Sequence, residues 1–162
     1  MMRPTTTRRR ASSIGLRSNL EGLAMSILVD SCGWSLLFRR KSQAAMSEDE
    51  QRIVASLTEA VRDGRVAIIG PIRQEILSGI KDLAQFEELR VALEAFEDEP
   101  ITTQHYVEAA RLFNICRSRG VECGSVDILM CAVASRKRWS ILTTDGGLKR
   151  CMEVLHTEGL LL

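Results

Sequence analysis

Short apolar runs alternate along the chain with longer segments in which apolar residues recur every three or four positions. The short runs have the length of buried strands and cover residues 26–30, 66–69 and 140–143, with 153–155 as a candidate fourth. The periodic segments predict helices over residues 33–40, 48–63, 71–83, 85–96, 103–119 and from 125 onward. This alternation predicts an α/β fold with a small, mostly parallel sheet flanked by helices.

Capping signals mark the beginning of several predicted helices. Ser47, followed three residues later by Glu50, is a capping box for the helix over residues 48–63. Thr102 or Thr103 is expected to cap the helix over 103–119, and Ser125 to cap the next one. The chain shows no internal repeat, and its length suits a single domain.

The first 24 residues differ from the rest of the chain. They hold five arginines and one acid, a net charge of +4, whereas residues 25–162 carry −3 and the whole chain +1. Serine and threonine are frequent in this stretch and apolar periodicity is missing. We therefore expect a disordered basic tail over residues 1–24 and one folded, mildly acidic domain over 25–162.

Three interpretations of the basic tail are open. An Arg-rich, acid-poor segment is typical of an organellar transit peptide, and it would also suit an arm that binds nucleic acid. The third interpretation, which we favour, is that translation starts at Met25, just before the first predicted strand. A tail without core residues adds nothing to the fold.

The remaining composition argues against several classes of protein. No apolar run approaches the roughly 20 residues that span a bilayer, so we expect no membrane partner. Aromatic residues make up only 4% of the chain, too few for an extended base-stacking platform. The five cysteines form no C-x-x-C pair and there are only two histidines, which gives poor support for structural zinc. The odd number of cysteines predicts free thiols and a cytoplasmic protein.

Four carboxylates stand at positions where a charged side chain is costly. Asp30 and Asp145 follow the first and third predicted strands, and the carboxyl ends of parallel strands meet at one edge of a sheet. Glu75 and Asp127 lie on predicted helices, beside the apolar stripe rather than opposite it. Crowded carboxylates repel one another and need a counter-charge. A hard divalent cation prefers oxygen ligands, so the set predicts a Mg²⁺ or Mn²⁺ site that activates water.

Each acid also has a purely structural interpretation. Asp30 is a candidate helix cap, Asp127 suits the positive end of a helix dipole, and Asp145 is a turn former before two glycines. Glu75 is the hardest to explain in this way, because a glutamate beside a core stripe needs a partner. Singly, the structural interpretations are favoured. The joint placement of all four acids favours a functional site.

The segments that hold these acids occur in a characteristic order: ILVDSCGW (27–34), GPIRQEILSGIKD (70–82), GSVDILMCAVA (124–134) and ILTTDGGL (141–148). This ordered set resembles PIN-domain ribonucleases, and most closely the VapC-type toxins of toxin–antitoxin pairs, over about residues 26–162. The resemblance implies a PIN-like fold and a Mg²⁺- or Mn²⁺-dependent endoribonuclease. Its catalytic, metal-binding acids would be Asp30, Glu75, Asp127 and Asp145.

The same resemblance implies further residues and partners. Ser31, and Thr143 or Thr144, match hydroxyls that orient metal-bound water or phosphate in the family. Relatives cleave RNA, usually form homodimers and are inhibited by a cognate antitoxin. Two departures stand out: Cys32 replaces a second polar residue after the first acid, and Gly147 replaces a further acid after Asp145.

Other polar residues have weaker claims to a role. Lys149, Arg150 and Arg73 are the candidate contacts to backbone phosphates, by proximity in sequence alone. Cys32 has no nearby histidine to activate it, so we do not expect a cysteine nucleophile. Trp34 and Trp139 are expected in the core, and no role is assigned to either histidine.

Two rival functions are open besides the RNase toxin. One is a catalytically inactive PIN-like module that binds RNA or a protein partner. The other, ranked last, is a phosphatase-like hydrolase that uses the same metals, because no pocket for a phosphate monoester is recognisable in the sequence.

Overall fold

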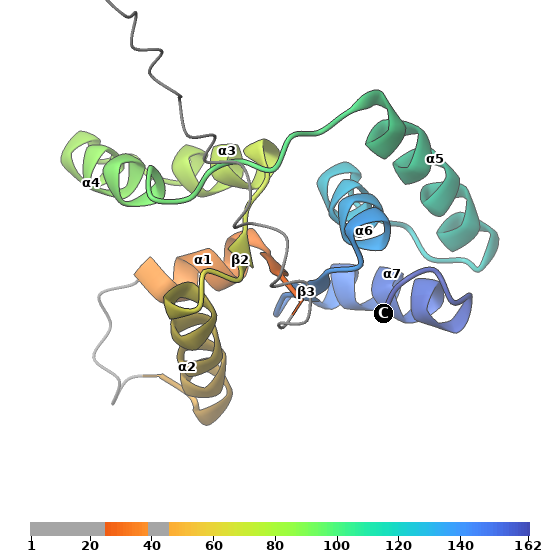
Figure 1. Ribbon diagram of the computed structural model, residues 1–162, viewed down its shortest axis with the longest axis horizontal. Helices are drawn as coiled ribbons and strands as arrows, with labels where there is room; N and C mark the ends of the chain where they lie inside the picture. Colours follow the sequence, from red (N-terminus) through yellow and green to blue (C-terminus); the bar gives the residue numbers. More distant parts are fainter. Residues whose placement is uncertain (1–24, 39–45) are drawn as a thin grey trace, which may run out of the picture.

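A small parallel sheet lies at the centre of the molecule. The computed structural model describes residues 25–38 and 46–162 (Figure 1). Strands β1 (Ile27–Val29), β2 (Val66–Ala67) and β3 (Ser140–Leu142) form a sheet of order β2-β1-β3. Ile27 is in register with Val66 on one side and with Ser140 on the other. The first strand in the sequence is therefore the middle strand, and both of its neighbours run parallel to it.

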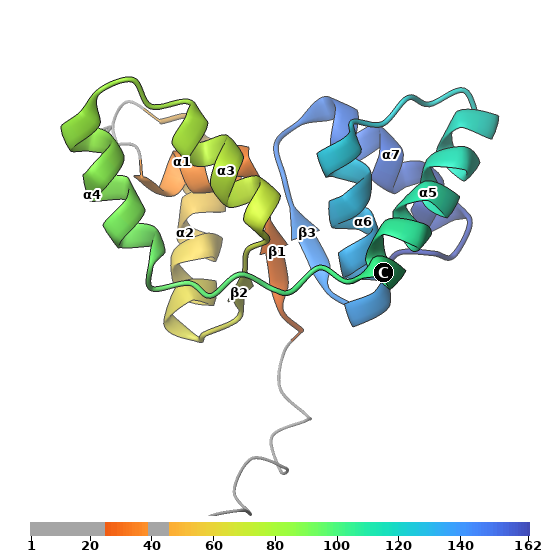
Figure 2. The same cartoon turned by 90° about the horizontal axis from the view of Figure 1, so that it is seen from above.

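The described helices flank this sheet in two groups. Their bounds are α1 (Ser31–Phe38), α2 (Glu48–Arg62), α3 (Gly70–Ser78), α4 (Leu83–Leu93), α5 (Thr103–Ser118), α6 (Ser125–Lys137) and α7 (Gly146–Thr157). Figure 2 shows α1 to α4 gathered on the β2 side of the sheet and α5 to α7 on the β3 side. The connection between α4 and α5 runs beside β2, where Asp98 forms a parallel bridge with Ile68.

The core joins the sheet to the helices around it. Trp34 of α1 is fully buried, donates its indole N–H to the carbonyl of Val29 at 3.1 Å and meets the edge of Phe96 at 4.7 Å between ring centroids. A Cβ at Gly33 would lie 2.8 Å from Val29 Cγ1, so only glycine lets α1 approach β1 this closely. Trp34 is thus a core residue as predicted. Trp139 is partly buried against the core, with the Lys137 ammonium 5.4 Å from its ring centre.

The predicted fourth strand at residues 153–155 is wrong, because these residues lie within α7. The buried residues of this segment are Leu148, Cys151 and Leu155, at the spacing of three and four that marks a helix. The Asp145 side chain caps the helix by accepting the N–H of Leu148 at 2.8 Å. Residues 153–155 form part of an amphipathic helix, and a stretch this short does not reveal the helical spacing.

The helix predicted over residues 71–83 ends earlier than expected, and the helix predicted over 85–96 begins earlier, at Leu83. α3 ends at its C-cap Gly79, and Asp82 starts α4 by accepting the N–H of Gln85 at 2.8 Å. Leu83, expected on the apolar stripe, is 75% exposed. The cap of α6 is Gly124 rather than Ser125, whereas Thr102 caps α5 as expected.

Two of the five cysteines are not free thiols, contrary to the prediction. Cys123 and Cys151 form a disulfide with 6.0 Å between their Cα atoms, and it fastens the loop before α6 to the middle of α7. Cys32, Cys116 and Cys131 remain free, and the last two are buried as expected. The sequence could not show this pair, because its members are 28 residues apart and form no recognised motif.

The predicted basic tail over residues 1–24 and the end of the helix predicted over 33–40 lie outside the described residues. Within the described residues, no helix has the length and apolarity needed to cross a membrane.

Candidate functional site

The four acids gather at one edge of the sheet. Asp30 follows β1 and Asp145 follows β3, and these strands are parallel neighbours. The charges of Asp30 and Asp145 both act on Asp127 at the beginning of α6, and those of Asp30 and Asp127 act on Glu75 of α3. Each acid is therefore within electrostatic range of at least one other. The structure brings together the four residues that the sequence singled out.

Asp30 is the most buried of the four acids, at 5% exposure. Its Oδ1 accepts the Ser31 backbone N–H at 2.6 Å, and its Oδ2 accepts from Thr143 Oγ1 at 2.8 Å and from Cys32 Sγ at 3.1 Å. Donors from both strand ends thus hold a charged side chain that would otherwise be costly to bury.

Asp145 is exposed, and the turn before it is held by side chains. Its backbone N–H donates to Thr143 Oγ1 at 2.9 Å, while its carboxylate caps α7. Thr143 is partly buried because it also donates to Asp30. Thr144 is exposed, and its N–H donates to Cys32 Sγ. Thr143 therefore orients the acids, and the Thr144 hydroxyl faces solvent at the same edge.

Glu75 is exposed, so its place beside the apolar stripe does not bury it, although its side chain does have a partner in Ser31. Glu75 is the residue before the buried Ile76 on α3. Because α3 lies at the edge of the molecule, a glutamate at this position can reach solvent. Partial desolvation nevertheless raises the pKa of Glu75. A hydrogen bond from Ser31 lowers this pKa, and the charges of Asp30 and Asp127 raise it further.

Asp127 is half-buried in the first turn of α6. Desolvation raises the pKa of this carboxyl, and the charges of Asp30 and Asp145 add to the increase, against a hydrogen bond from the Gly124 backbone. A Cβ at Gly124 would lie only 2.8 Å from Asp127 Oδ2. The missing side chain of Gly124 is thus what lets the carboxylate take this position.

Among residues 25–38 and 46–162, no ion pair supplies a counter-charge for these acids. The ion pairs found among residues 25–38 and 46–162 join other acids, and none joins a lysine or arginine to one of the four. In the same described residues, no three Asp, Glu, His or Cys side chains already surround a common point as metal ligands. The donors are all carboxylate oxygens, and two pKa values are raised by neighbouring negative charge. In donor chemistry and in charge, this set fits a hard divalent cation.

The three predicted phosphate contacts differ in their placement. Arg73 is wrong as a phosphate contact: its Nε donates to Asp98 at 2.9 Å and its Nη1 to the Leu93 carbonyl at 2.9 Å, so it fastens α3 to the end of α4. Arg150 reaches back along α7, where its guanidinium and the Asp145 carboxylate both lie within 4.0 Å of a Cβ position at Gly147. Lys149 is exposed beside it.

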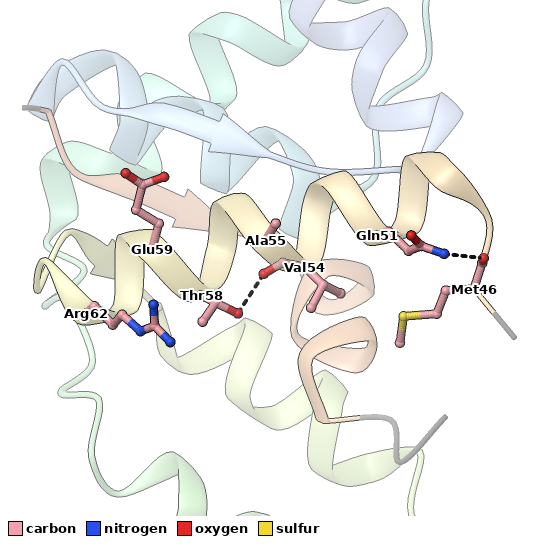
Figure 3. Close-up of a pocket in the computed structure, with 7 residues that line it drawn as sticks. All are labelled: Met46, Gln51, Val54, Ala55, Thr58, Glu59 and Arg62. Carbon is pink, nitrogen blue, oxygen red and sulfur yellow. Dashed lines mark hydrogen bonds between the residues drawn. The ribbon is translucent and has the colours of Figure 1, made fainter. Parts of the chain in front are cut away.

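Of two hollows formed by the described residues, one adjoins the acids. A groove of about 1600 Å³ between α1, α3 and α4 is lined by Ser31 and Glu75 at one end and by Asp82, Glu87 and Glu88 along α4. The smaller hollow in Figure 3 lies on α2 between Met46 and Arg62 and contains none of the four acids. The groove is therefore the concave surface continuous with the candidate site.

The fold and the site define a class: an α/β protein with carboxylates crowded at the carboxyl edge of a parallel sheet. The sequence matches the PIN domain family over residues 27–153, and the chain belongs to this family. Proteins of the family are generally nucleases and typically use divalent metals. The predicted PIN-like fold is confirmed.

A solved structure supports the same fold. The crystal structure of FitAcB from Neisseria gonorrhoeae superposes with a TM-score of 0.64 at 19% identity, and the match covers 78% of this chain and 93% of that one. At this level of identity the likeness concerns the fold alone. No curated protein is significantly similar to the chain in sequence.

Two residues of the site escaped the sequence analysis. Cys32 was rejected as a nucleophile and noted as a departure from the family, but it was given no structural role, although its thiol joins Asp30 to Thr144. Gly124 was not considered at all. A glycine three residues before an acid at a helix start is a usable signal, because both residues then face the same turn. The contact of Cys32 with a residue 112 positions away has no local signal.

Proposed function

We propose that the protein is a metal-dependent endoribonuclease and the toxin of a VapC-type toxin–antitoxin pair. The observation that carries the proposal is the gathering of Asp30, Glu75, Asp127 and Asp145 at one sheet edge, where no lysine or arginine of the described residues forms an ion pair with them. Desolvation raises the pKa of Glu75 and of Asp127, and neighbouring negative charge raises both further, which is the electrostatic condition that a cation relieves. Membership of a family of nucleases supports the reaction class.

In this proposal the four carboxylates hold one or two Mg²⁺ or Mn²⁺ ions. When bound, the metal supplies an activated water and stabilises charge on the phosphodiester. Asp30 is fixed by its hydrogen bonds from Ser31 and Thr143 and offers a rigid anionic anchor. Glu75 and Asp145 are exposed and reach toward solvent, where RNA would approach.

The basic side chains beside the acids would contact the substrate. Lys149 and Arg150 are exposed on the first turns of α7, next to Asp145. They are placed to meet backbone phosphates that flank the scissile bond. Thr144 offers a hydroxyl on the same edge. We therefore assign substrate binding to the start of α7 and catalysis to the four acids.

The test compares Asp30→Asn and Asp127→Asn with wild type in RNA cleavage, growth inhibition and calorimetric Mn²⁺ titration. Loss of all three activities is expected, because each substitution keeps the size of the side chain and removes a negative charge. Glu153→Gln is a matched control, since Glu153 is an exposed acid on α7, the helix that Asp145 caps. Retained cleavage and toxicity in both Asp variants would exclude the proposal.

One observation favours an alternative, the catalytically inactive PIN-like binding module. Three of the acids already have structural partners at helix N-termini, and the described side chains form no ready set of metal ligands. Calorimetry separates the two functions. An inactive module would bind no Mn²⁺ in the millimolar range and would bind RNA or protein equally well with Asp30→Asn.

Partners and location follow from the same proposal. We expect a cognate antitoxin, a homodimer and a cytoplasmic location. Co-purification with the product of an adjacent reading frame tests the antitoxin, and light scattering of the purified chain tests the dimer. A monomer at micromolar concentration would contradict the dimer without affecting the nuclease assignment.

A further inference from the structure

Cys32 lies between the two strand ends that carry Asp30 and Asp145. Its Sγ donates to Asp30 Oδ2 at 3.1 Å, accepts the backbone N–H of Thr144 at 3.1 Å and lies 3.6 Å from Thr143 Oγ1. The first contact belongs to the turn after β1, and the other two belong to the turn after β3. One small side chain therefore joins the two turns that present the acids.

Cys32 and Thr143 share this task. Thr143 Oγ1 donates to Asp30 Oδ2 at 2.8 Å and accepts the N–H of Asp145 at 2.9 Å. The two side chains thus accept successive amides, those of Thr144 and Asp145, and both donate to the same carboxylate oxygen. The arrangement closes on itself, so a shift of Asp30 would disturb the turn before Asp145.

We propose that Cys32 is a positioning residue, which holds Asp30 and the turn before Asp145 in a fixed relation. The inference rests on the proposed nuclease function, because it concerns the alignment of two of its acids. The role uses the neutral thiol: the S–H donates to Asp30 while a sulfur lone pair accepts the Thr144 amide. The thiol itself takes no part in bond making.

Two substitutions separate this role from simple space filling. Cys32→Ser keeps one donor and two acceptor lone pairs in a side chain of similar shape. Cys32→Ala removes both hydrogen bonds and leaves the Thr144 N–H without its acceptor. Cys116→Ala is the matched control, since this thiol is fully buried and lies in the core, away from the four acids.

The first measurement does not depend on nuclease activity. Amide hydrogen exchange of the full chain, resolved by NMR, should show faster exchange at Thr144 in Cys32→Ala. Asp145 should follow, because the Thr143 side chain loses a neighbour. Cys32→Ser should restore the wild-type rates, and Cys116→Ala should leave these two amides unchanged relative to the rest of β3 and α7. Unchanged exchange at Thr144 in Cys32→Ala would overturn the proposal.

The second measurement links the position of the acids to metal binding. Loss of a residue that hydrogen-bonds to a metal ligand typically lowers metal affinity or activity about 10- to 100-fold. Cys32→Ala should therefore weaken Mn²⁺ binding and lower kcat by about 10- to 100-fold. KM for RNA should stay within roughly threefold, because no phosphate contact is removed. Cys32→Ser should recover most of both losses.

The outcomes distinguish this proposal from the nuclease assignment. If Asp30→Asn abolishes cleavage and Mn²⁺ binding while Cys32→Ala resembles wild type, the nuclease stands and the role of Cys32 is refuted. If Cys32→Ser is as impaired as Cys32→Ala, hydrogen bonding is not what Cys32 contributes, and the proposal fails. If Asp30→Asn changes neither activity, the nuclease assignment fails, and the exchange rates alone decide the role of Cys32.

Discussion

Gly124 controls where the Asp127 carboxylate can lie, and replacing it by alanine tests the site by steric means alone. Gly124 caps α6 with φ −62° and ψ 152°, a conformation that alanine adopts without strain. Its added Cβ would nevertheless come within 2.8 Å of Asp127 Oδ2 and 3.3 Å of Asp127 Cγ. Contacts this short do not persist, so the carboxylate must move.

The expected effect on stability is small. Alanine in place of glycine stabilises a compatible position by about 0.4–1 kcal/mol through the unfolded state. Displacing the carboxylate weakens its hydrogen bond from the Gly124 backbone, and a bond to a charged group contributes about 1.5–3 kcal/mol. The two effects oppose each other, so the net loss should not exceed about 2.6 kcal/mol, or roughly 5–10 °C in Tm.

The expected effect on metal binding is large by comparison. A displaced carboxylate should lower Mn²⁺ affinity about 10- to 100-fold, the range found when the support of a metal ligand is lost. Calorimetric Mn²⁺ titration and thermal unfolding of Gly124→Ala measure the two effects on one sample. Gly79→Ala is the control: Gly79 has φ −76°, and its added Cβ would make only ordinary contacts of 3.7 Å or more. Wild-type Mn²⁺ affinity in a folded Gly124→Ala protein would refute the reasoning.

Three further predictions concern the fold around the site. Arg73→Ala should lower the free energy of unfolding in urea by about 1.5–3 kcal/mol, because the Asp98 ion pair and the hydrogen bond to the Leu93 carbonyl are lost together. A loss below about 0.5 kcal/mol, which is typical of a surface ion pair, would contradict the structural role. Burial and then the charge of Arg136 lower the pKa of His105, so the unfolded chain binds its proton first. Stability should therefore be complete above the unfolded pKa of about 6.5 and fall as the pH drops toward the lowered folded pKa, and His105→Gln should remove this part of the acid sensitivity. Cys123→Ser should lower stability by about 3–4 kcal/mol and abolish the effect of dithiothreitol on Tm, since the disulfide closes a loop of 28 residues. Titration of all five cysteines as free thiols in wild type denatured without reductant would show that no disulfide forms.

Local patterns were sufficient to predict most of the helices and strands, but not where every helix ends. The capping box at Ser47 and Glu50 and the cap at Thr102 lie where the sequence indicated. The break between α3 and α4 was predicted too far along the chain, because Ile80 and Leu83 continue the apolar spacing, although Gly79 and Asp82 end one helix and start the next. Periodicity reports which residues could share a face and carries no information on whether the helix continues.

The sequence was sufficient to predict which acids form the candidate site, but not their exposure or their hydrogen bonds. Asp30 and Asp145 follow parallel strands, and topology alone places such residues together. The exposure of Glu75 depends on how far α3 lies from its neighbours, which no spacing in the sequence encodes. The contacts of Cys32 depend on the register of β1 against β3, where Val29 pairs with Leu142. Long-range register is set by packing, so this part of the site needed the structure.

The structural and the functional interpretations of these acids support each other. Asp30 precedes α1 and accepts the Ser31 N–H, Asp127 lies in the first turn of α6, and Asp145 caps α7. Helix N-termini carry partial positive charge, so three of the four carboxylates sit where the backbone offsets their repulsion. Glu75 lies in the middle of α3 without this help and receives a hydrogen bond from Ser31 instead. The fold can therefore hold the four acids together before a cation binds. Desolvation first, and then repulsion between the acids, raises the pKa values of Glu75 and Asp127, and a bound cation would relieve the repulsion.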